Sequence, residues 1–310
     1  MTYHNRRAFL KNSGLLASGI ALAGIGCASS ADKKAGIAAG NILAGDSSAV
    51  PIAGHTLDRF GLQLYTLRDD LPKDPKGILK QAAGFGYKQF EGYEGDKGMF
   101  WGMKNTEFKK YMDDLGVTMI SSHCDTKKNF ERKAADAAEI GMKYLLTGWV
   151  GKQKSVDDYK KIADDFNKYG GICKKNGIKF AYHNHDYSFK AVDGQFPQDI
   201  FMMNTNPDTI DYEMDIYWVV TAGADPIEWL KKYPNRFRLC HIKDRMKGAS
   251  PTEEDASVDV GTGSIDFKKI LRVAEDSGMQ YYIVEQEKYE NTTPLKSAEA
   301  DANYLKTFTF

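Results

Sequence analysis

The sequence predicts an α/β protein, a (β/α)8 TIM barrel that forms a single domain over residues 57–310. Eight short β-rich segments recur along this part of the chain, and segments with helical patterning lie between them. The helical segments end on glycine, and the region spans roughly 250 residues, which is the usual size of this barrel. Strands, helices and chain length therefore agree on one architecture.

The predicted strands are short runs rich in β-branched and aromatic residues. Their starts lie too far apart for hairpins, and the spacing is that of parallel strands joined by crossover helices. The eight predicted strands cover residues 60–65, 87–91, 117–122, 144–147, 178–183, 209–215, 237–241 and 281–285.

The segments between the strands carry apolar residues on one helical face, as Ile270, Leu271 and Ala274 do. A glycine at the end of each segment supplies the left-handed turn that leads into the next strand. An open doubly wound sheet is the alternative, but no GxGxxG pattern follows the first strand. The predicted helices cover residues 75–86, 106–116, 130–141, 156–177 and 267–278.

The charge balance limits the class of partner. Lys+Arg and Asp+Glu both number 42 in the 310 residues, so the chain has no basic excess for nucleic acid. A neutral small molecule fits better. The four cysteines form no CxxC pair, so neither a disulfide framework, a structural zinc motif nor a thiol nucleophile is expected.

Residues 1–26 have the features of an export signal of the twin-arginine type. Arg6 and Arg7 precede an uncharged apolar run over residues 15–25. This run is well short of the roughly 20 residues that a transmembrane helix requires. We therefore expect a bacterial protein that is exported to the periplasm or held at a membrane as a lipoprotein.

Cys27 lies where bacterial lipoproteins are cleaved and acylated, although Gly24 replaces the larger aliphatic residue usual three positions earlier. A lipid anchor at Cys27 is therefore left open. Residues 27–56 are rich in Ala, Gly and Ser without a sustained period, which predicts a flexible tether outside the fold.

Polar residues gather at the ends of the predicted strands, where a barrel of this kind carries its functional groups. Imidazoles and carboxylates are costly to bury singly, and a divalent cation satisfies several together. The ligands would come from strands five to eight. Mixed ligands of this kind suit Mn, Zn, Co or Fe better than Ca, and Mg stays open. The strand-end residues are Gln63, Tyr65, Glu91, His123, Trp149, His183, Asn184, His185, Glu213, Asp215, His241, Lys243, Asp244, Glu285 and Glu287.

Five motifs in the strand-end regions occur in the order YHNHDY, EMDIYW, CHIKD, GTGSID and IVEQE. With them, residues 57–310 resemble the sugar phosphate isomerase/epimerase family of xylose isomerase-like barrels. The ketose epimerases of that family hold a metal with Glu, Asp, His and Glu from strands five to eight. By strand position, the resemblance implies that His183, Asp215, His241 and Glu285 are the metal ligands here.

One position departs from that pattern. The epimerases use the glutamates of strands five and eight as paired bases, and here His183 replaces the first. The chain is in this respect closer to the branch of inosose dehydratases and 3-keto-sugar enzymes. The resemblance implies a metal-dependent isomerase or epimerase that removes a proton beside a carbonyl of a sugar or polyol through a metal-stabilised enediolate. The alternative is a lyase or hydratase acting on 3-keto-glycosides or inosose.

Individual roles follow from the same chemistry. Glu285 is the expected base, and His185 or His123 is the expected acid, because imidazole titrates near neutrality. Lys243 would hold a substrate oxygen or, as the resemblance implies, help to polarise the carbonyl; a salt bridge to Asp244 is the alternative. For Glu91, a structural role is the alternative to substrate binding. The predicted substrate-binding residues are Tyr65, Glu91, Trp149, Asn184 and Trp218.

Three further hypotheses are weighed. Residues 261–263, Gly-Thr-Gly, lie where barrels often bind phosphate. Export argues against a phosphorylated substrate, however. A carbohydrate-binding protein with a decayed site is disfavoured by the full set of candidate ligands. A metal-dependent endonuclease would need a basic groove, which the neutral charge balance disfavours. A homo-oligomer is left open.

Overall fold

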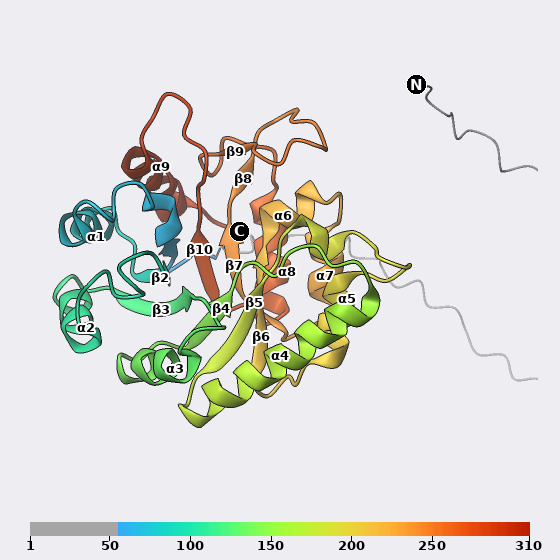
Figure 1. Cartoon of the computed structure of the whole chain (residues 1–310). Helices are drawn as coiled ribbons and strands as arrows, with labels where there is room; N and C mark the ends of the chain where they lie inside the picture. Colours follow the sequence, from blue (N-terminus) through green and yellow to red (C-terminus); the bar gives the residue numbers. More distant parts are fainter. Residues whose placement is uncertain (1–54) are drawn as a thin grey trace, which may run out of the picture. The chain divides into compact units, whose positions relative to one another are not determined.

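The computed structural model describes residues 55–310, and in them eight parallel strands close into a barrel (Figure 1). β1 pairs with β2 on one side and with β10 on the other, so the sheet has no free edge. The predicted fold is confirmed, and the open sheet is wrong. The barrel strands are β1 Gly61–Gln63, β2 Gln89–Tyr93, β3 Thr118–His123, β4 Tyr144–Thr147, β5 Lys179–His183, β6 Ile210–Asp215, β7 Phe237–Ile242 and β10 Tyr281–Val284.

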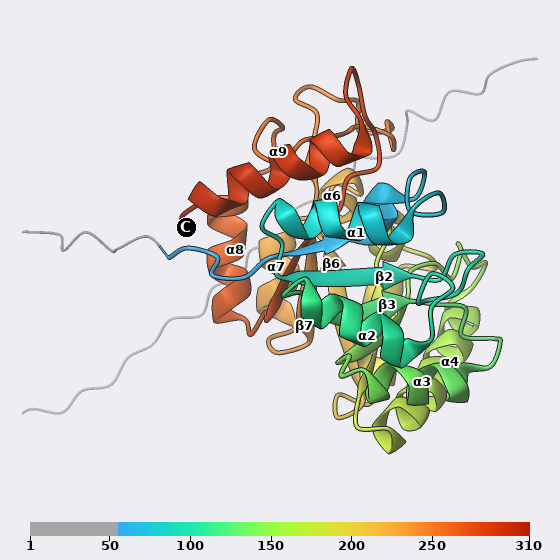
Figure 2. The ribbon, with the colours of Figure 1, turned by 90° about the vertical axis from the view of Figure 1, so that its left-hand side faces the viewer.

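Helices surround the barrel, and all five predicted helices are present (Figures 1 and 2). Side chains such as Ser155 and Asp266 cap their N-termini by accepting a backbone N–H. Gly86 and Gly116 follow α1 and α2 with positive φ, as expected for helix ends. The helices are α1 Pro75–Gly84, α2 Asn105–Asp114, α3 Phe130–Glu139, α4 Val156–Lys175, α5 Pro197–Asn204, α6 Ile216–Thr221, α7 Pro226–Lys232, α8 Phe267–Asp276 and α9 Pro294–Thr307.

Shorter elements occupy the loops at the mouth of the barrel. The 3-10 helices Leu64–Leu67 and Asp186–Phe189 directly follow β1 and β5. The strands β8 Asp244–Arg245 and β9 Ser257–Val258 form an antiparallel pair between β7 and α8. Figure 2 shows α9 lying beside α1, so the last helix packs against the first.

The barrel interior changes character along its axis. At the N-terminal ends of the strands an apolar cluster fills it, because side chains alternate between the interior and the helix layer. Beyond this cluster, the inward positions become polar toward the C-terminal ends of the strands, where carboxylates and imidazoles collect. The apolar cluster consists of Tyr144, Leu146, Ala181, Leu239 and Ile283.

Two irregularities interrupt the otherwise regular pairing. The register shifts between Phe90 and Glu91 where β2 pairs with β3, and between Tyr212 and Glu213 where β6 pairs with β7. One extra residue in a strand reverses which face the following side chains occupy. The shifts therefore aim the ends of β3 and β7, with His123 and His241, at the barrel interior.

The predicted signal peptide, the possible acylation site Cys27 and nearly all of the tether lie outside the described residues, so they stay predictions. At the end of the predicted tether, His55 N donates to Phe310 O and Thr56 forms a bridge with Thr309. The described fold thus includes two residues before the predicted start at 57. Among residues 55–310, no helix has the length and apolarity needed to cross a membrane.

Candidate metal centre

The mouth of the barrel opens into a cleft of about 760 Å³. Its lining includes imidazoles from the ends of β3 and β5 and two carboxylates that follow β10, and the loops after β2 and β3 add Glu94, Asp96 and Asp125. Aromatic side chains form part of the rim. The lining residues that concern the site are Gln63, Tyr65, Tyr93, His123, Gly148, Trp149, His183, His185, Glu285 and Glu287.

The four predicted metal ligands lie together at the floor of this cleft. Oδ2 of Asp215 lies 3.7 Å from Nδ1 of His241 and 3.9 Å from Nε2 of His183. Oε2 of Glu285 lies 3.2 Å from Nδ1 of His241. One potential ligand atom each from Asp215, His241 and Glu285 lies within 4.8 Å of the others. His183 approaches this group through Asp215, but it also belongs to a second group of potential ligands with the same spacing, formed with His123, Glu213 and His241. The strand ends thus carry two overlapping groups that share His241.

Asp215 gives a test of whether a cation fits there. Its Oδ1 accepts the backbone N–H of Trp218 at the start of α6, at 3.1 Å. Its Oδ2 is buried and has no hydrogen-bond partner among the described residues. A buried carboxylate oxygen without a partner is costly. It faces two imidazole nitrogens and a second carboxylate, a donor set that suits a divalent transition metal or zinc.

The local charge also favours a cation. Burial by itself lowers the pKa of His241, but Glu213 and Glu285 raise it well above its usual value. The same acidic surroundings raise the pKa of Lys243 against the effect of burial, mainly through Glu287 and Glu285. The negative field at the floor of the cleft is thus strong enough to keep two buried groups protonated.

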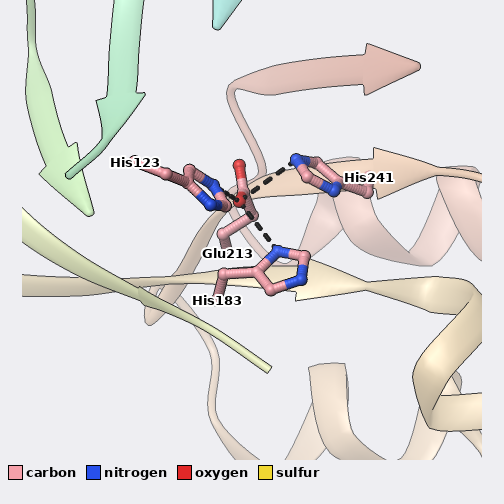
Figure 3. Close-up of side chains that lie close together, drawn as sticks. All are labelled: His123, His183, Glu213 and His241. Atoms are coloured by element: carbon pink, nitrogen blue, oxygen red, sulfur yellow. Dashed lines mark hydrogen bonds and ion pairs between the residues drawn. The ribbon is translucent and has the colours of Figure 1, made fainter. Parts of the chain in front are cut away.

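Two further carboxylates, Glu213 and Glu91, contact the histidines of the site, and Figure 3 shows Glu213 among three of the rings. Oε2 of Glu213 lies 3.0 Å from Nε2 of His123, 3.0 Å from Nδ1 of His183 and 3.2 Å from Nε2 of His241. Oε1 of Glu91 lies 2.8 Å from Nε2 of His241. These two carboxylates join three imidazoles into one buried network.

Glu91 and Glu213 are ionised despite their burial. Burial by itself raises both pKa values, but His123 and His241 lower that of Glu91 below its usual range. For Glu213, burial and Glu91 raise the pKa, whereas His241, His123 and His183 bring it down to about 2. Gln63 and Ser121 donate further hydrogen bonds to Glu91. The two carboxylates are therefore fixed anions.

The two candidate acids differ in charge. Burial lowers the pKa of His123, but Glu91 and Glu213 outweigh it and raise the pKa to about 10. Burial lowers the pKa of His185 to about 4. At neutral pH His123 is therefore an imidazolium, and His185 is a neutral imidazole. Gly148 passes so close to Nδ1 of His123 that a Cβ there would lie 2.7 Å from it, so only glycine leaves this edge uncovered.

Lys243 is enclosed at the side of the site. Its ammonium group contacts Glu287, lies 3.3 Å from Oε2 of Glu285 and lies over the rings of Tyr217 and Trp218. The predicted alternative, a salt bridge to Asp244, is wrong, because the Asp244 carboxylate turns away to accept backbone N–H groups.

Asp244 fills the turn that could have held phosphate. Its carboxylate accepts the N–H groups of Gly261 and Gly263 at 3.0 and 2.9 Å, and those of Ile265 and Arg245. Such a set of converging N–H groups is an anion-binding nest. Here the anion is a side chain of the chain itself, so the nest at 261–263 has no room for a substrate phosphate.

The remaining predicted residues divide into two groups. Tyr65, His123, Trp149 and His185 line the cleft, and the exposed fractions of Tyr65 and Trp149 are 40% and 63%. The others lie beneath or beside it. Glu91 is fully buried, Asn184 holds the backbone of Asp215, and Trp218 packs against His185 and Lys243.

Sequence reasoning gave no role to Glu213, Glu287, Gln63 or Ser121. A period of two could have indicated the first two, because Glu213 precedes Asp215 by two residues and Glu287 follows Glu285 by two. The contact of Ser121 with Glu91 depends on the register shift in β3, which no pattern in the sequence reveals.

The sequence pattern of the xylose isomerase-like TIM barrel family matches residues 79–308. The chain belongs to this family. An inosose dehydratase of Clostridium perfringens is 28% identical over an alignment of 164 positions, and the match covers 48% of this chain and 54% of that enzyme. The chain thus spans about half the length of the curated relatives that it matches. The resemblance seen in the sequence is confirmed.

Solved structures extend the likeness over the whole barrel. A sugar phosphate isomerase/epimerase from Parabacteroides distasonis is 30% identical with a TM-score of 0.68, and the match covers 85% of this chain and 97% of that one. The IolI protein with a bound zinc atom is 18% identical with a TM-score of 0.66, covering 79% and 96%. At that identity the second likeness shows the fold alone. The chain is therefore a member of a family of xylose isomerase-like enzymes.

Proposed function

We propose that this xylose isomerase-like barrel is a divalent-metal-dependent lyase or hydratase. In the elimination direction it removes a C–H proton beside the carbonyl of an unphosphorylated keto-sugar or keto-polyol, and a hydroxyl or alkoxyl group takes up a proton and leaves the neighbouring carbon as water or an alcohol. In the hydration direction the same step runs in reverse: water adds to the carbon–carbon double bond, and the carbon beside the carbonyl regains its proton. The observation that carries this proposal is the difference between the groups after β10 and those at the ends of β3 and β5. Next to the candidate ligands, the groups after β10 are the carboxylates of Glu285 and Glu287, whereas those at the ends of β3 and β5 are imidazoles.

Unlike groups suit elimination better than inversion. Inverting a carbon through two equivalent proton transfers calls for a similar base on each face of the substrate. Elimination needs a base for the C–H proton and a proton donor for the leaving oxygen, which are different groups. His183 occupies the position at which a second glutamate would supply the matching base.

Glu285 is the base in this proposal. Its hydrogen bonds within the described residues use Oε2, toward His241 and Lys243, which leaves Oε1 available to accept a proton. Lys243 and His241 lower the pKa of Glu285 despite its burial, so the carboxylate is ionised at neutral pH. Lys243 also holds Glu287 in place beside it.

His123 is the proton donor in this proposal. Its Nε2 is held by Glu91 and Glu213, while its Nδ1 lies on the side that Gly148 leaves uncovered. The raised pKa means that the ring carries a proton to give at neutral pH. The neutral His185, which lines the cleft, would then accept a hydrogen bond from a substrate hydroxyl.

Four residues would hold the cation: His183, Asp215, His241 and Glu285. A divalent cation bound by them supplies positive charge next to the substrate oxygens on which negative charge develops. The four side chains come from adjacent strands, so their separation is set by the barrel itself rather than by a mobile loop.

The substrate is uncharged in this proposal. Asp244 already occupies the anion-binding turn at 261–263, and a second anion there would be repelled. Tyr65 and Trp149 stand exposed on either side of the cleft, where their rings can stack on the apolar face of a sugar. An inosose or a 3-keto-glycoside meets both requirements.

An isomerase or epimerase acting on a free sugar is the second candidate. The 30% identity to the sugar phosphate isomerase/epimerase from Parabacteroides distasonis favours it. Both candidates share the first step, the removal of a proton beside a carbonyl, and they differ in the fate of the resulting enediolate.

The test uses that shared step. Metal-loaded protein is incubated in D₂O with an inosose, a 3-keto-glucoside and free fructose, and deuterium content and product mass are measured. We expect deuterium exchange with loss of water or of the aglycone from a keto substrate. Exchange with an isomeric product from fructose alone would favour the second candidate. Glu285→Gln is the control that should abolish exchange. Exchange by that variant at the wild-type rate would overturn the assigned base.

A further inference from the structure

The two histidines of the proposed metal site present opposite nitrogens to it. His183 turns Nε2 toward Asp215, at 3.9 Å, and Nδ1 toward Glu213, at 3.0 Å. His241 turns Nδ1 toward Asp215 and Glu285, at 3.7 and 3.2 Å, and Nε2 toward Glu91 and Glu213, at 2.8 and 3.2 Å. Figure 3 shows both rings directed at the same carboxylate oxygen of Glu213.

A neutral imidazole carries one N–H and one lone pair, and only the lone pair binds a metal. A carboxylate next to one nitrogen holds the proton there and leaves the other nitrogen free. Because the two rings face Glu213 and Glu91 through opposite nitrogens, the carboxylates would select opposite tautomers: Nδ1–H in His183 and Nε2–H in His241.

The burial of Glu91 and Glu213 and the backbone around them agree with a role in fixing the tautomers. Neither Glu91 nor Glu213 has exposed surface, so neither touches a substrate in the cleft. Each follows a register shift in an otherwise regular barrel, and these shifts bring His123 and His241 to face inward. The backbone thus departs from regular pairing where a carboxylate must meet an imidazole.

We propose that Glu213, assisted by Glu91, is a positioning residue that fixes these two tautomers, so that His183 binds the metal through Nε2 and His241 through Nδ1. This rests on the proposed function insofar as it takes the same four residues as the metal site. Glu213 acts on the metal through the ligands, without contact with the substrate.

The first experiment identifies the coordinating nitrogens. The protein is labelled with ¹⁵N-histidine, and two-bond ¹H–¹⁵N spectra are recorded before and after zinc is added. We expect two of the six histidines to change, one with a coordinated Nε2 and protonated Nδ1 and one with the reverse pattern. If both used the same nitrogen, the proposal would be overturned.

The second experiment removes the charge that holds the tautomers. Glu213→Gln keeps the shape but accepts less strongly, so zinc affinity, measured by competition with a chelator, should fall by about 10- to 100-fold. In the zinc-free variant, the ring of His183, whose pKa burial lowers well below its usual value, should then show a mixture of its two tautomers. Unchanged affinity together with an unchanged histidine spectrum would overturn the proposal.

Asp211→Asn is the matched control. Asp211 is a buried carboxylate on the same strand, two residues earlier, but it contacts Tyr144 and Lys179 rather than a histidine. Its replacement should leave zinc affinity within about twofold of wild type, whereas an equal loss in both variants would mean general loosening of β6 and would overturn the specific role. If wild-type protein bound no zinc, or Asp215→Asn bound it normally, the metal site itself would fail, which is a different result from failure of Glu213 alone.

Discussion

The two ends of β6 carry buried carboxylates that differ in one respect. At the N-terminal end, Asp211 accepts hydrogen bonds from Tyr144 and Lys179 and lies beside the apolar cluster of the barrel interior. At the C-terminal end, Asp215 keeps one buried oxygen without a partner. The same strand thus ends in a carboxylate that the chain satisfies by itself and in one that it does not.

This difference separates structure from function along the barrel axis. The N-terminal end is complete, because each charge has a partner and the apolar side chains fill the rest. The C-terminal end has carboxylates in excess of its protonated groups, and it holds a fully buried lysine among three of them. Because its carboxylates outnumber its protonated groups, the C-terminal end favours the binding of a cation. Substitutions at the two ends test this contrast.

The largest effect is expected from Asp215→Asn. Losing this ligand should remove several kcal/mol of charge stabilisation in the transition state, or about 10³-fold in kcat/KM. Bound metal, measured by elemental analysis after gel filtration, should drop in parallel. Asp211→Asn should keep both metal and activity and lose only stability. If Asp215→Asn retained full metal and activity, the contrast between the two ends of β6 would be wrong.

A smaller effect, on stability, is expected from Lys243→Met. Removing one member of a buried ion pair leaves the other charge uncompensated, which costs about 3–5 kcal/mol. Urea unfolding of metal-free protein should show this loss, and zinc should restore part of it by replacing the missing positive charge. The control at the opposite end is Lys179→Met. Lys179 also pairs with a buried carboxylate, Asp211, but is 37% exposed. Lys179→Met should lower the free energy of unfolding by only about 0–1 kcal/mol.

Much of the barrel could be predicted because its determinants are local. Most strands are short apolar runs, each of the five predicted helices is followed by a glycine, and the parallel order follows from the spacing. That the candidate ligands lie close together could be predicted too, since strand ends in a barrel meet at one face; that they bind a metal stays a prediction. His183, Asp215, His241 and Glu285 lie together because position along a strand fixes position in the barrel.

The contacts of Glu91 and Glu213 with the histidines could not be predicted, because they join strands distant in sequence. Glu91 meets His241 across 150 residues, and the register shift in β3 decides which side chains face inward. Glu91 and Asn184 were expected to contact substrate. The structure places both beneath the cleft, where they hold His241 and the backbone of Asp215. Burial of this kind depends on the assembled barrel rather than on any local pattern.

Asp301 offers a sharper test, because it too has a buried carboxylate oxygen without a partner. It lies on α9, away from the cleft, and has no imidazoles around it. Burial raises its pKa well above the usual value, with Asp259 and Asp244 adding to the effect. We therefore expect the carboxyl group of Asp301 to be protonated rather than to bind a metal.

The sign of the pH effect follows from that raised pKa. Below the unfolded-state pKa both states are protonated. As pH rises through it, the unfolded chain loses its proton while folded Asp301 keeps it, so stability falls until the folded pKa is reached. Asp301→Asn has no proton to lose, so it should raise the free energy of unfolding at pH 7, with no gain near pH 3. Denaturant midpoints at both pH values measure this, and an equal change at both would contradict it.

The smallest effect is expected at the rim. Trp149 is 63% exposed and contacts His185 and Tyr187 edge to face. Trp149→Ala should raise KM by about fivefold to tenfold, roughly 1 kcal/mol of lost stacking on the sugar, while kcat stays within about twofold. The free energy of unfolding should not change, because little of the indole is buried. Trp149→Phe is the matched variant and should recover most of the affinity. A fall in kcat with KM unchanged would mean that Trp149 acts in the chemical step rather than in substrate binding. The rim would then have to be counted as part of the reacting site.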